Sequence, residues 1–214
     1  MKPEKLDHVA LYVPDPEEVA ACLLSQLPFR ILEQTDEFVL VGRAPELGKL
    51  TFFEAKGPRE PGPLLRIGIG IPAGVEQRTL WLGDETGLEL TLVPSAPDGE
   101  VDLVHVALAT EDPSRTAQDW LGLGLQPAPK SDVGVCRVRL GAAFVELHRT
   151  SVAPTGKPLL NHLGLLVQSI DEVDRDRLDV VREVDAEHSR AVFVKGPDGV
   201  EVEYIEHKPS FALA

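Results

Sequence analysis

Three histidines and two glutamates stand at matching places of a pattern that this chain repeats. His8, His105 and His162 are each the third residue of a stretch that reads Leu-x-His-aliphatic-[Ala/Gly]-aliphatic. Glu146 follows His105 by 41 residues, and Glu203 follows His162 by the same 41 residues. Neutral imidazole and carboxylate together suit divalent iron, manganese, cobalt, nickel or zinc. The matched spacing therefore predicts a divalent metal site, with His105, Glu146, His162 and Glu203 as its ligands.

A fourth copy of the pattern carries arginine where the other three carry histidine. This copy covers residues 64–71, and Arg66 occupies its third position. The residue that matches the two glutamates falls near Thr91, so this copy has lost both candidate ligands. All four copies keep a small residue two places after the polar one, which leaves room beside the ring. These small residues are Ala10, Gly68, Ala107 and Gly164.

Each copy has the composition of a buried β-strand, and the segments after it form a repeated module. Alternate side chains of a strand face the same way, so each histidine shares a face with the small residue that follows it. Asp15-Pro16 and Asp112-Pro113 are typical helix starts, with an N-cap and a proline at the first helical position. Shorter apolar stretches complete the order βαβββ. The predicted fold class is α+β, with four such modules forming two cupped mixed sheets with helices outside.

The second and fourth modules differ from the full pattern. Residues 64–93 lack a helical pattern, so module two is a shortened unit. Module four has a predicted helix near residues 170–178 and a last strand at 201–206. A segment with Pro and Gly at 95–100 predicts the main boundary. It separates one module pair at residues 1–98 from a second pair at residues 99–214, which carries the expected metal site.

The way in which the modules pair decides which ligands meet. Pairing of modules three and four gives the four-ligand set described above. Pairing of modules one and four gives His8, Glu54, His162 and Glu203 instead, because Glu54 ends the last strand of module one. His162 and Glu203 belong to both sets, and the sequence leaves the choice open.

Composition excludes several classes of partner. The 214 residues carry a formal net charge of −14, which disfavours nucleic acid and anionic membranes. No apolar run reaches the length of a membrane span, and the first residues lack a hydrophobic signal core. Cys22 and Cys136 stand far apart without a CxxC pair, which is typical of reduced thiols. We therefore expect a cytoplasmic protein with a small-molecule substrate, and a homodimer is compatible with these features.

These residues and modules resemble the vicinal-oxygen-chelate superfamily. The resemblance rests on the paired βαβββ modules, the first-strand histidine, and the segment Gly-Pro-Asp-Gly-Val-Glu-Val-Glu that ends at Glu203. That superfamily includes glyoxalase I, methylmalonyl-CoA epimerase, type I extradiol dioxygenases, and bleomycin and fosfomycin resistance proteins. The resemblance covers nearly the whole chain. It implies a metal-dependent enzyme that acts on a small substrate through two adjacent oxygens.

The resemblance implies two different reactions. Four modules in one chain resemble the extradiol dioxygenases, which implies an iron site of His105, His162 and Glu203. Their signature has a tyrosine ten residues before the glutamate ligand, where this chain has Phe193. Adding Glu146 gives the two-His, two-Glu site of glyoxalase I, in which the metal stabilises an enediolate and Glu146 or Glu203 acts as the catalytic base. A non-catalytic binding protein of the resistance type, with a pocket and no metal, is the alternative.

Overall fold

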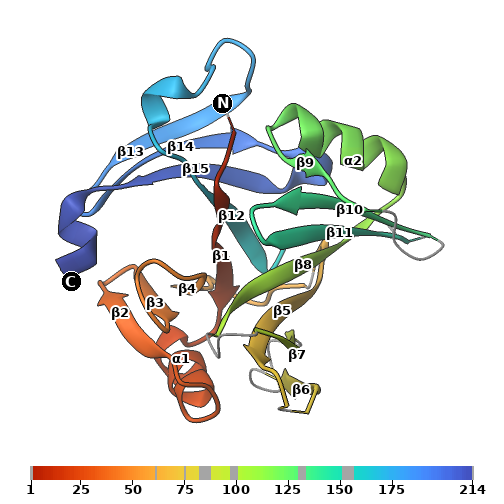
Figure 1. Ribbon diagram of the computed structural model, residues 1–214. Coiled ribbons are helices and arrows are strands. Elements are labelled where there is room, and N and C mark those ends of the chain that lie inside the picture. Colours follow the sequence, from red (N-terminus) through yellow and green to blue (C-terminus); the bar gives the residue numbers. More distant parts are fainter. Residues whose placement is uncertain are drawn as a thin grey trace.

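Two open β-sheets form the protein in the computed structural model (Figure 1). The structure describes residues 2–60, 62–74, 76–81, 88–96, 101–129, 134–150 and 157–213. Within these ranges the first sheet has eight strands, in the order β13 (Val180–Asp185), β14 (Ser189–Lys195), β15 (Glu201–His207), β12 (Leu160–Leu166), β1 (Lys5–Val13), β4 (Lys49–Glu54), β3 (Phe38–Gly42) and β2 (Arg30–Gln34). The second has seven, in the order β6 (Arg78–Trp81), β7 (Glu89–Ala96), β5 (Leu64–Pro72), β8 (Asp102–Thr110), β11 (Ala143–Arg149), β10 (Val135–Leu140) and β9 (Gln126–Pro127).

Both sheets mix parallel and antiparallel neighbours, and both curve into cups. In the first sheet β1 is antiparallel to β12 and parallel to β4. In the second sheet β8 is antiparallel to β5 and parallel to β11. The expected α+β fold with two cupped mixed sheets is confirmed, and we call the concave faces of the two sheets the first cup and the second cup.

The sheets show which modules pair. Modules one and four build the first sheet, and modules two and three build the second, so the chain leaves the first sheet and returns to it at β12 (Figure 1). The expected pairing of modules three and four in one C-terminal unit is not what the sheets contain. All four first strands carry the same pattern, so the pattern alone does not select a partner. The expected boundary at residues 98 and 99 lies outside the described residues.

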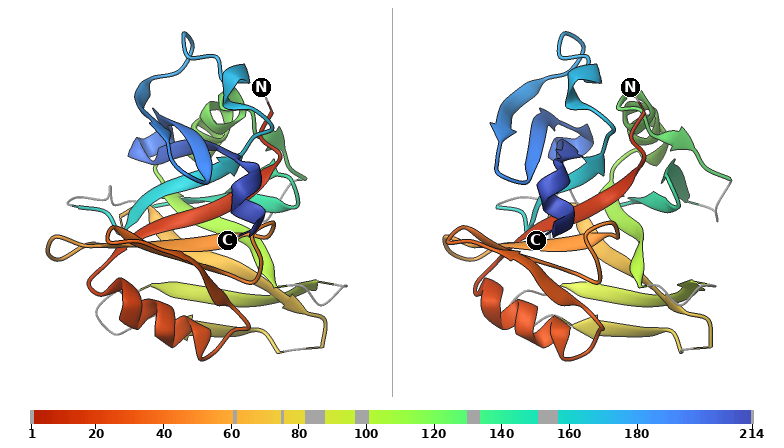
Figure 2. Two further views of the ribbon diagram at one scale, coloured as in Figure 1. Left: turned by 90° about the vertical axis from the view of Figure 1, so that its left-hand side faces the viewer. Right: turned by 60° about the vertical axis from the view of Figure 1, so that its left-hand side comes forward.

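Two helices begin where the sequence predicts. The carboxylate of Asp15 accepts hydrogen bonds from the first turn of α1 (Pro16–Leu24), and the carboxylate of Asp112 does the same for α2 (Pro113–Gly122). Both helices lie outside the cups, against the outer faces of the sheets (Figures 1 and 2). The hydroxyl of Tyr204 on β15 donates to the carbonyl of Leu123 at 2.9 Å, which joins the end of α2 to the first sheet. No helix in the described ranges is long and apolar enough to cross a membrane.

The hydrophobic core fills the space behind the two cups. Val9 and Leu11 on β1 belong to the same buried cluster as Val106 and Leu108 on β8. Because side chains alternate along a strand, this packing turns the intervening residues of both strands into the cups. His8 is one of these residues, so the core itself holds the polar side chains of the cups in position.

Module four lacks the helix that the sequence predicts near residues 170–178. Ile170–Glu172 form only a 3₁₀ turn, η1, and the backbone is extended again at Val173. The guanidinium of Arg175 donates to the carbonyls of Ile170 and Val173 and to the carboxylate of Glu183. These bonds link the non-helical segment to itself and to β13, and the prediction of a helix from this charge-rich segment was wrong.

Candidate metal centre

β1 and β12 bring His8 and His162 together at the centre of the first cup. The antiparallel register places His8 opposite Gly164 and Ala10 opposite His162. A Cβ atom on Gly164 would lie 2.3 Å from Cε1 of His8, so glycine gives this ring its space. Gly164 therefore accommodates the ring of the histidine on the paired strand.

β15 adds Glu203, which lies opposite Gly164 in the parallel register of β12 and β15. The Nε2 atoms of His8 and His162 are 2.9 Å apart. Oε2 of Glu203 lies 3.0 Å from Nε2 of His8 and 3.1 Å from Nε2 of His162. All three side chains are buried. Three neighbouring strands thus direct three donor atoms at one point, and we call His8, His162 and Glu203 the triad.

Hydrogen bonds alone do not explain why these two nitrogen atoms and one oxygen atom, the three corners of a triangle, lie so close to one another. An N–H group points along one edge, and a hydrogen bond weakens steeply when it is bent. If both rings donated to Glu203, both Nε2 atoms would carry a hydrogen. These two N–H groups would then repel each other, because the Nε2 atoms are only 2.9 Å apart. By contrast, two donors about 2.1 Å from one ion and at right angles to each other lie roughly 3.0 Å apart. The measured edges of 2.9, 3.0 and 3.1 Å fit three ligands on one face of an octahedral cation.

The ring nitrogens that face away from the triad are held by the residues just before each histidine. Nδ1 of His8 lies 2.9 Å from Oδ2 of Asp7, and Nδ1 of His162 lies 3.1 Å from Oδ1 of Asn161. Such partners select the tautomer in which Nδ1 carries the proton and leave Nε2 available to a metal. The triad therefore has the outer contacts that are typical of histidine ligands.

Asp7 is fully buried and serves three partners. Besides His8, its carboxylate accepts from Nζ of Lys49 at 2.8 Å and lies 2.9 Å from Nε2 of His207. Lys49 is equally buried. Burial favours the protonated form of Asp7, but Lys49 and the two imidazoles outweigh it and hold the pKa of Asp7 well below its usual range. The carboxylate therefore stays ionised and orients His8.

Replacing Asp7 by asparagine is expected to weaken metal binding by about 10- to 100-fold, because outer carboxylates orient and polarise ligating imidazoles. The same change leaves Lys49 buried without its anion and should lower the free energy of unfolding by about 3–5 kcal/mol. A double variant, Asp7→Asn with Lys49→Met, should recover stability in urea but not metal affinity in a chelator competition. Wild-type affinity in the double variant would contradict the orienting role of Asp7.

The charges of the triad favour one bound proton when no metal is present. Burial disfavours a charged His8, but the carboxylates of Glu203 and Asp7 raise the pKa of His8 to about 9. Burial likewise disfavours an ionised Glu203, but the positive charge of His8 and the close contact with the two imidazoles lower the pKa of Glu203 to about 2. Burial lowers the pKa of His162. A metal ion that binds below about pH 9 therefore displaces a proton from His8.

This proton gives metal binding a defined pH dependence. Between the ordinary value of 6.5 and about 9, apparent affinity for nickel is expected to rise about tenfold per pH unit. The raised pKa of His8 also stabilises the metal-free fold below pH 6.5, and this contribution disappears as pH rises through about 9. Chelator-buffered titrations at several pH values measure the first effect, and urea unfolding of metal-free protein measures the second. A pH-independent affinity would show that His8 carries no proton to displace.

Aromatic side chains line the first cup around the triad. The ring of Phe193 stands perpendicular to that of His162, with 5.1 Å between centroids, and the ring of Phe53 lies at 6.2 Å. The guanidinium of Arg182 lies 3.6 Å from the centre of the Phe193 ring and 2.7 Å from a carboxylate oxygen of Glu201. The cup therefore combines flat apolar walls with one ion pair beside the triad.

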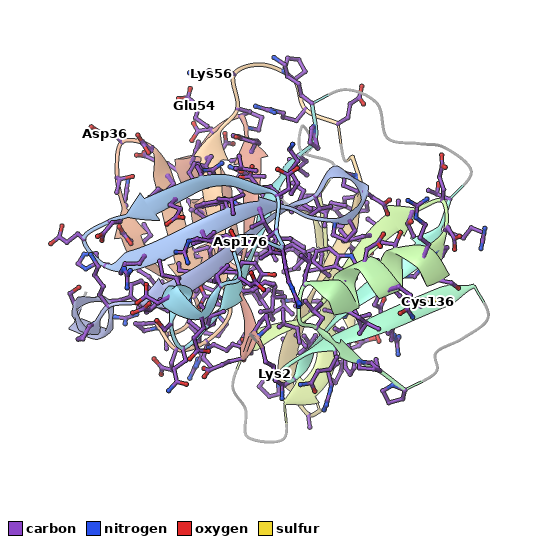
Figure 3. The ribbon with its side chains drawn as sticks, turned by 90° about the horizontal axis from the view of Figure 1, so that it is seen from above. Lys2, Asp36, Glu54, Lys56, Cys136 and Asp176 are labelled. Atoms are coloured by element: carbon purple, nitrogen blue, oxygen red, sulfur yellow. The ribbon has the colours of Figure 1, made fainter. Side chains whose placement is uncertain are left out.

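The fourth corner of the site holds Thr51 rather than a carboxylate. The parallel register of β1 and β4 places Thr51 opposite Ala10, which itself lies opposite His162. Glu54 is three residues further along β4, and its exposed side chain projects at the edge of the molecule (Figure 3). Among the described residues, the cluster of His, Cys, Asp or Glu that could hold an ion is the triad.

The other two expected ligands lie in the second sheet. His105 is on β8, and Glu146 is on the neighbouring strand β11. Oε2 of Glu146 lies 2.9 Å from Nη2 of Arg66, and Oε1 lies 2.6 Å from Nη2 of Arg137. The structure therefore brings His162 and Glu203 together with His8, and it does not bring His105 or Glu146 to them. The equal spacing of 41 residues reflects equivalent positions in two modules of different sheets.

Sequence reasoning missed the residues that support the triad, although a signal was present. A polar residue precedes the histidine in the two copies that form the triad, namely Asp7 and Asn161. The corresponding residues in the second sheet are Leu65 and Val104. A histidine ligand needs an outer hydrogen-bond partner, so this difference distinguishes the two sheets.

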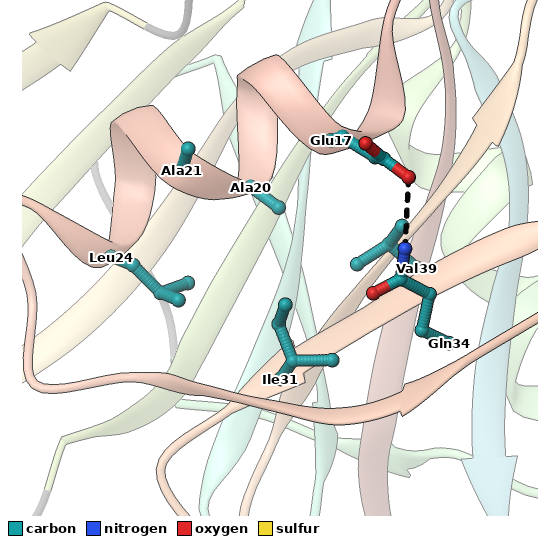
Figure 4. Close-up of a pocket in the computed structure, with 7 residues that line it drawn as sticks. All are labelled: Glu17, Ala20, Ala21, Leu24, Ile31, Gln34 and Val39. Carbon is teal, nitrogen blue, oxygen red and sulfur yellow. Dashed lines mark hydrogen bonds between the residues drawn. The ribbon is translucent and has the colours of Figure 1, made fainter.

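A small groove elsewhere on the surface has none of this chemistry. It lies between α1 and the strands β2 and β3, on the outer side of the first sheet, and has a volume of about 170 Å³ (Figure 4). Glu17 accepts a hydrogen bond from Gln34 across it at 2.9 Å. The remaining lining residues are Ala20, Ala21, Leu24, Ile31 and Val39. One carboxylate among apolar side chains does not make a metal site.

Comparison with solved structures places the fold. A "putative dioxygenase" from Bacillus subtilis superposes with a TM-score of 0.75 at 17% identity, covering 99% of this chain and 87% of that one. Glyoxalase I from Zea mays superposes with a TM-score of 0.72 at 15% identity, covering 94% and 92%. No family model matches the sequence, and no curated protein matches it either. The chain has the fold of the vicinal-oxygen-chelate superfamily.

Proposed function

We propose that this protein is a mononuclear iron(II) enzyme that cleaves a small catechol-like substrate with dioxygen. The observation that carries the proposal is a buried triad of two histidines and one glutamate, with Thr51 at the fourth corner. Two histidines and one carboxylate on one face, with open positions beside them, are the ligand set of non-haem Fe(II) oxygenases. Ring cleavage needs three open positions, two for the adjacent oxygens of the substrate and one for dioxygen. Three protein ligands leave these positions open.

The ligand count favours this reaction over isomerisation of the glyoxalase type. The glyoxalase-like alternative needs a second carboxylate ligand, which is Glu146 in one expected set and Glu54 in the other. Glu54 is exposed, three residues beyond Thr51 on β4. Glu146 instead contacts Arg66 and Arg137 in the second sheet. Likeness in fold to both classes of enzyme does not distinguish them, whereas the residues of the first cup do.

The residues of the first cup have separate roles in this proposal. Bound iron would hold the diol and dioxygen next to each other and pass electrons between them. Phe53 and Phe193 flank His162, confine a flat substrate and exclude water. Glu201 lies two residues before Glu203 on the same face of β15 and accepts a proton from a substrate hydroxyl. Arg182 orients Glu201 through their 2.7 Å ion pair.

The reaction needs no further reductant. The carbon–carbon bond beside the diol breaks, both atoms of dioxygen enter the product, and the substrate supplies all the electrons. The protons released by the hydroxyls pass to Glu201 and to water. The proposal therefore requires only iron, dioxygen and the substrate.

The test is reconstitution with Fe(II) under nitrogen, followed by catechols in oxygenated buffer. We expect one bound iron per chain and equal molar uptake of dioxygen and catechol, measured with an oxygen electrode and by product absorbance. Glu201→Gln should lower kcat about 100-fold at unchanged iron content, since general bases contribute at least this much. Isomerisation of hemithioacetals by the nickel- or zinc-loaded protein would overturn the proposal. Tight binding of a ligand without any turnover would favour a non-catalytic binding protein.

A further inference from the structure

The second cup contains a counterpart of the metal centre in which an arginine side chain takes the place of one histidine. His105 lies opposite Gly68 as His8 lies opposite Gly164, and a Cβ atom on Gly68 would lie 2.2 Å from the ring of His105. Arg66 lies opposite Ala107 as His162 lies opposite Ala10. Arg66 therefore stands where the first cup has a histidine ligand, and its guanidinium contacts Glu146.

This arrangement satisfies Glu146 without a metal. Its carboxylate contacts Arg66 at 2.9 Å, Arg137 at 2.6 Å and His148 at 3.3 Å. Burial disfavours ionisation of Glu146, but His105, His148 and the two arginines lower the pKa of Glu146. Two guanidinium charges beside the carboxylate also oppose entry of a divalent cation. The second cup is therefore unsuited to a metal.

The cluster keeps an excess of positive charge that faces the solvent. Arg66 and Arg137 contribute two positive charges against the single charge of Glu146, in a chain whose net charge is −14. Their side chains are 35% and 40% exposed, so part of each guanidinium is open to a ligand. Within the described residues, each guanidinium contacts Glu146 through a single nitrogen, whereas the group has five N–H donors. Nε2 of His105 is buried without a hydrogen-bond partner in the same ranges.

An exposed tryptophan lies on the same face of the second sheet. Trp81 on β6 lies opposite Glu89 on β7, and the carboxylate of Glu89 accepts a hydrogen bond from the hydroxyl of Thr91. Thr91 in turn lies opposite Gly68 on β5, which places Trp81 on the face that carries Arg66. The Trp81 side chain is 60% exposed, which is unusual for the largest apolar residue. A flat apolar surface and a group of arginines thus share one concave face.

We propose that the second cup is a metal-free binding site for a small organic acid, whose carboxylate pairs with Arg137 and Arg66 and whose flat body lies toward Trp81. Arginine presents parallel N–H groups that match a carboxylate. Arg66 and Arg137 leave one positive charge beyond that of Glu146, and Glu89 lies on the same face, so the site suits a monoanion better than a dianion. This site does not depend on the metal of the first cup.

Benzoate is a suitable probe, with neutral benzamide and cationic benzylamine as matched controls. The chain has two tryptophans, and Trp120 is fully buried, so a ligand in the second cup should change the fluorescence of Trp81. On metal-free full-length protein we expect benzoate to bind with a dissociation constant of about 1 mM or tighter, and benzamide at least about tenfold more weakly. Stronger binding of benzylamine than of benzoate would overturn the proposal.

Two variants locate the bound benzoate. Arg137→Gln should weaken benzoate binding about tenfold or more, and Arg66→Lys should weaken it less because the charge remains. Urea unfolding of the metal-free variants shows whether the fold is intact. His162→Ala alters only the first cup and should bind benzoate as the wild type does. Undetectable binding, unchanged binding in Arg137→Gln, or loss of binding in His162→Ala would each refute the assignment to the second cup.

Discussion

Replacing His162 with alanine is expected to abolish metal binding and to lower kcat/KM of the iron-reconstituted protein by about a thousandfold or more. In the proposed site His162 supplies one of three ligands, and its loss would leave two, which are too few to hold an ion in place. A bound metal contributes several kcal/mol to stabilisation of a transition state, which corresponds to a change of this size. His8→Ala and Glu203→Gln should have the same effect. Elemental analysis after reconstitution and desalting measures the metal, and oxygen uptake measures the rate.

The matched controls are His105→Ala and Glu146→Gln. They remove the equivalent residues of the second sheet and should leave one metal per chain. Glu146→Gln weakens contacts with two arginines, so its stability should be checked by urea unfolding alongside the metal content. Loss of metal in either control, with metal retained in His8→Ala, would contradict the site built by modules one and four.

The fold could be predicted from the sequence because the same strand and helix signals recur in several modules. The polar–aliphatic–small pattern marks the central strands, and the Asp-Pro pairs mark both helix starts. The helix expected at residues 170–178 is only a 3₁₀ turn, after which Arg175 binds the carbonyls of Ile170 and Val173 in a non-helical segment. Local patterns therefore identified most of the helices and strands, and the segment at residues 170–178 is the exception.

The expected set of four ligands contains two members of the triad, His162 and Glu203, and lacks the third, His8. His162 and Glu203 belong to one module and lie on adjacent parallel strands, so their meeting does not depend on how modules pair. The third ligand does depend on it, and four similar first strands leave that choice undetermined. Glu54 was considered as a partner because it ends its strand, whereas the register shows that Thr51 holds that corner. Strand register is a property of the assembled sheet, which spacing in the sequence does not reveal.

The second large effect is expected when Gly164, which leaves space for the ring of His8, is replaced. Gly164→Ala is expected to weaken metal binding more than about 100-fold, beyond the loss from an outer-sphere change. The new Cβ atom would lie 2.3 Å from Cε1 and Nδ1 of His8, so it meets the imidazole ring itself. The ring must rotate or shift, which moves Nε2 out of the triad and strains its contact with Asp7. Isothermal titration of metal-free protein with nickel measures the affinity.

Gly68→Ala is the matched control, because it places a Cβ atom 2.2 Å from the ring of His105 in the second sheet. Overpacking of this kind costs about 1–3 kcal/mol, so both variants should lose similar stability in urea. Only Gly164→Ala should lose the metal, since only the histidine beside Gly164 belongs to the triad. Equal metal affinity in the two variants would mean that the position of His8 does not determine binding. Loss of metal in both would mean that general strain, rather than the ring of His8, controls the site.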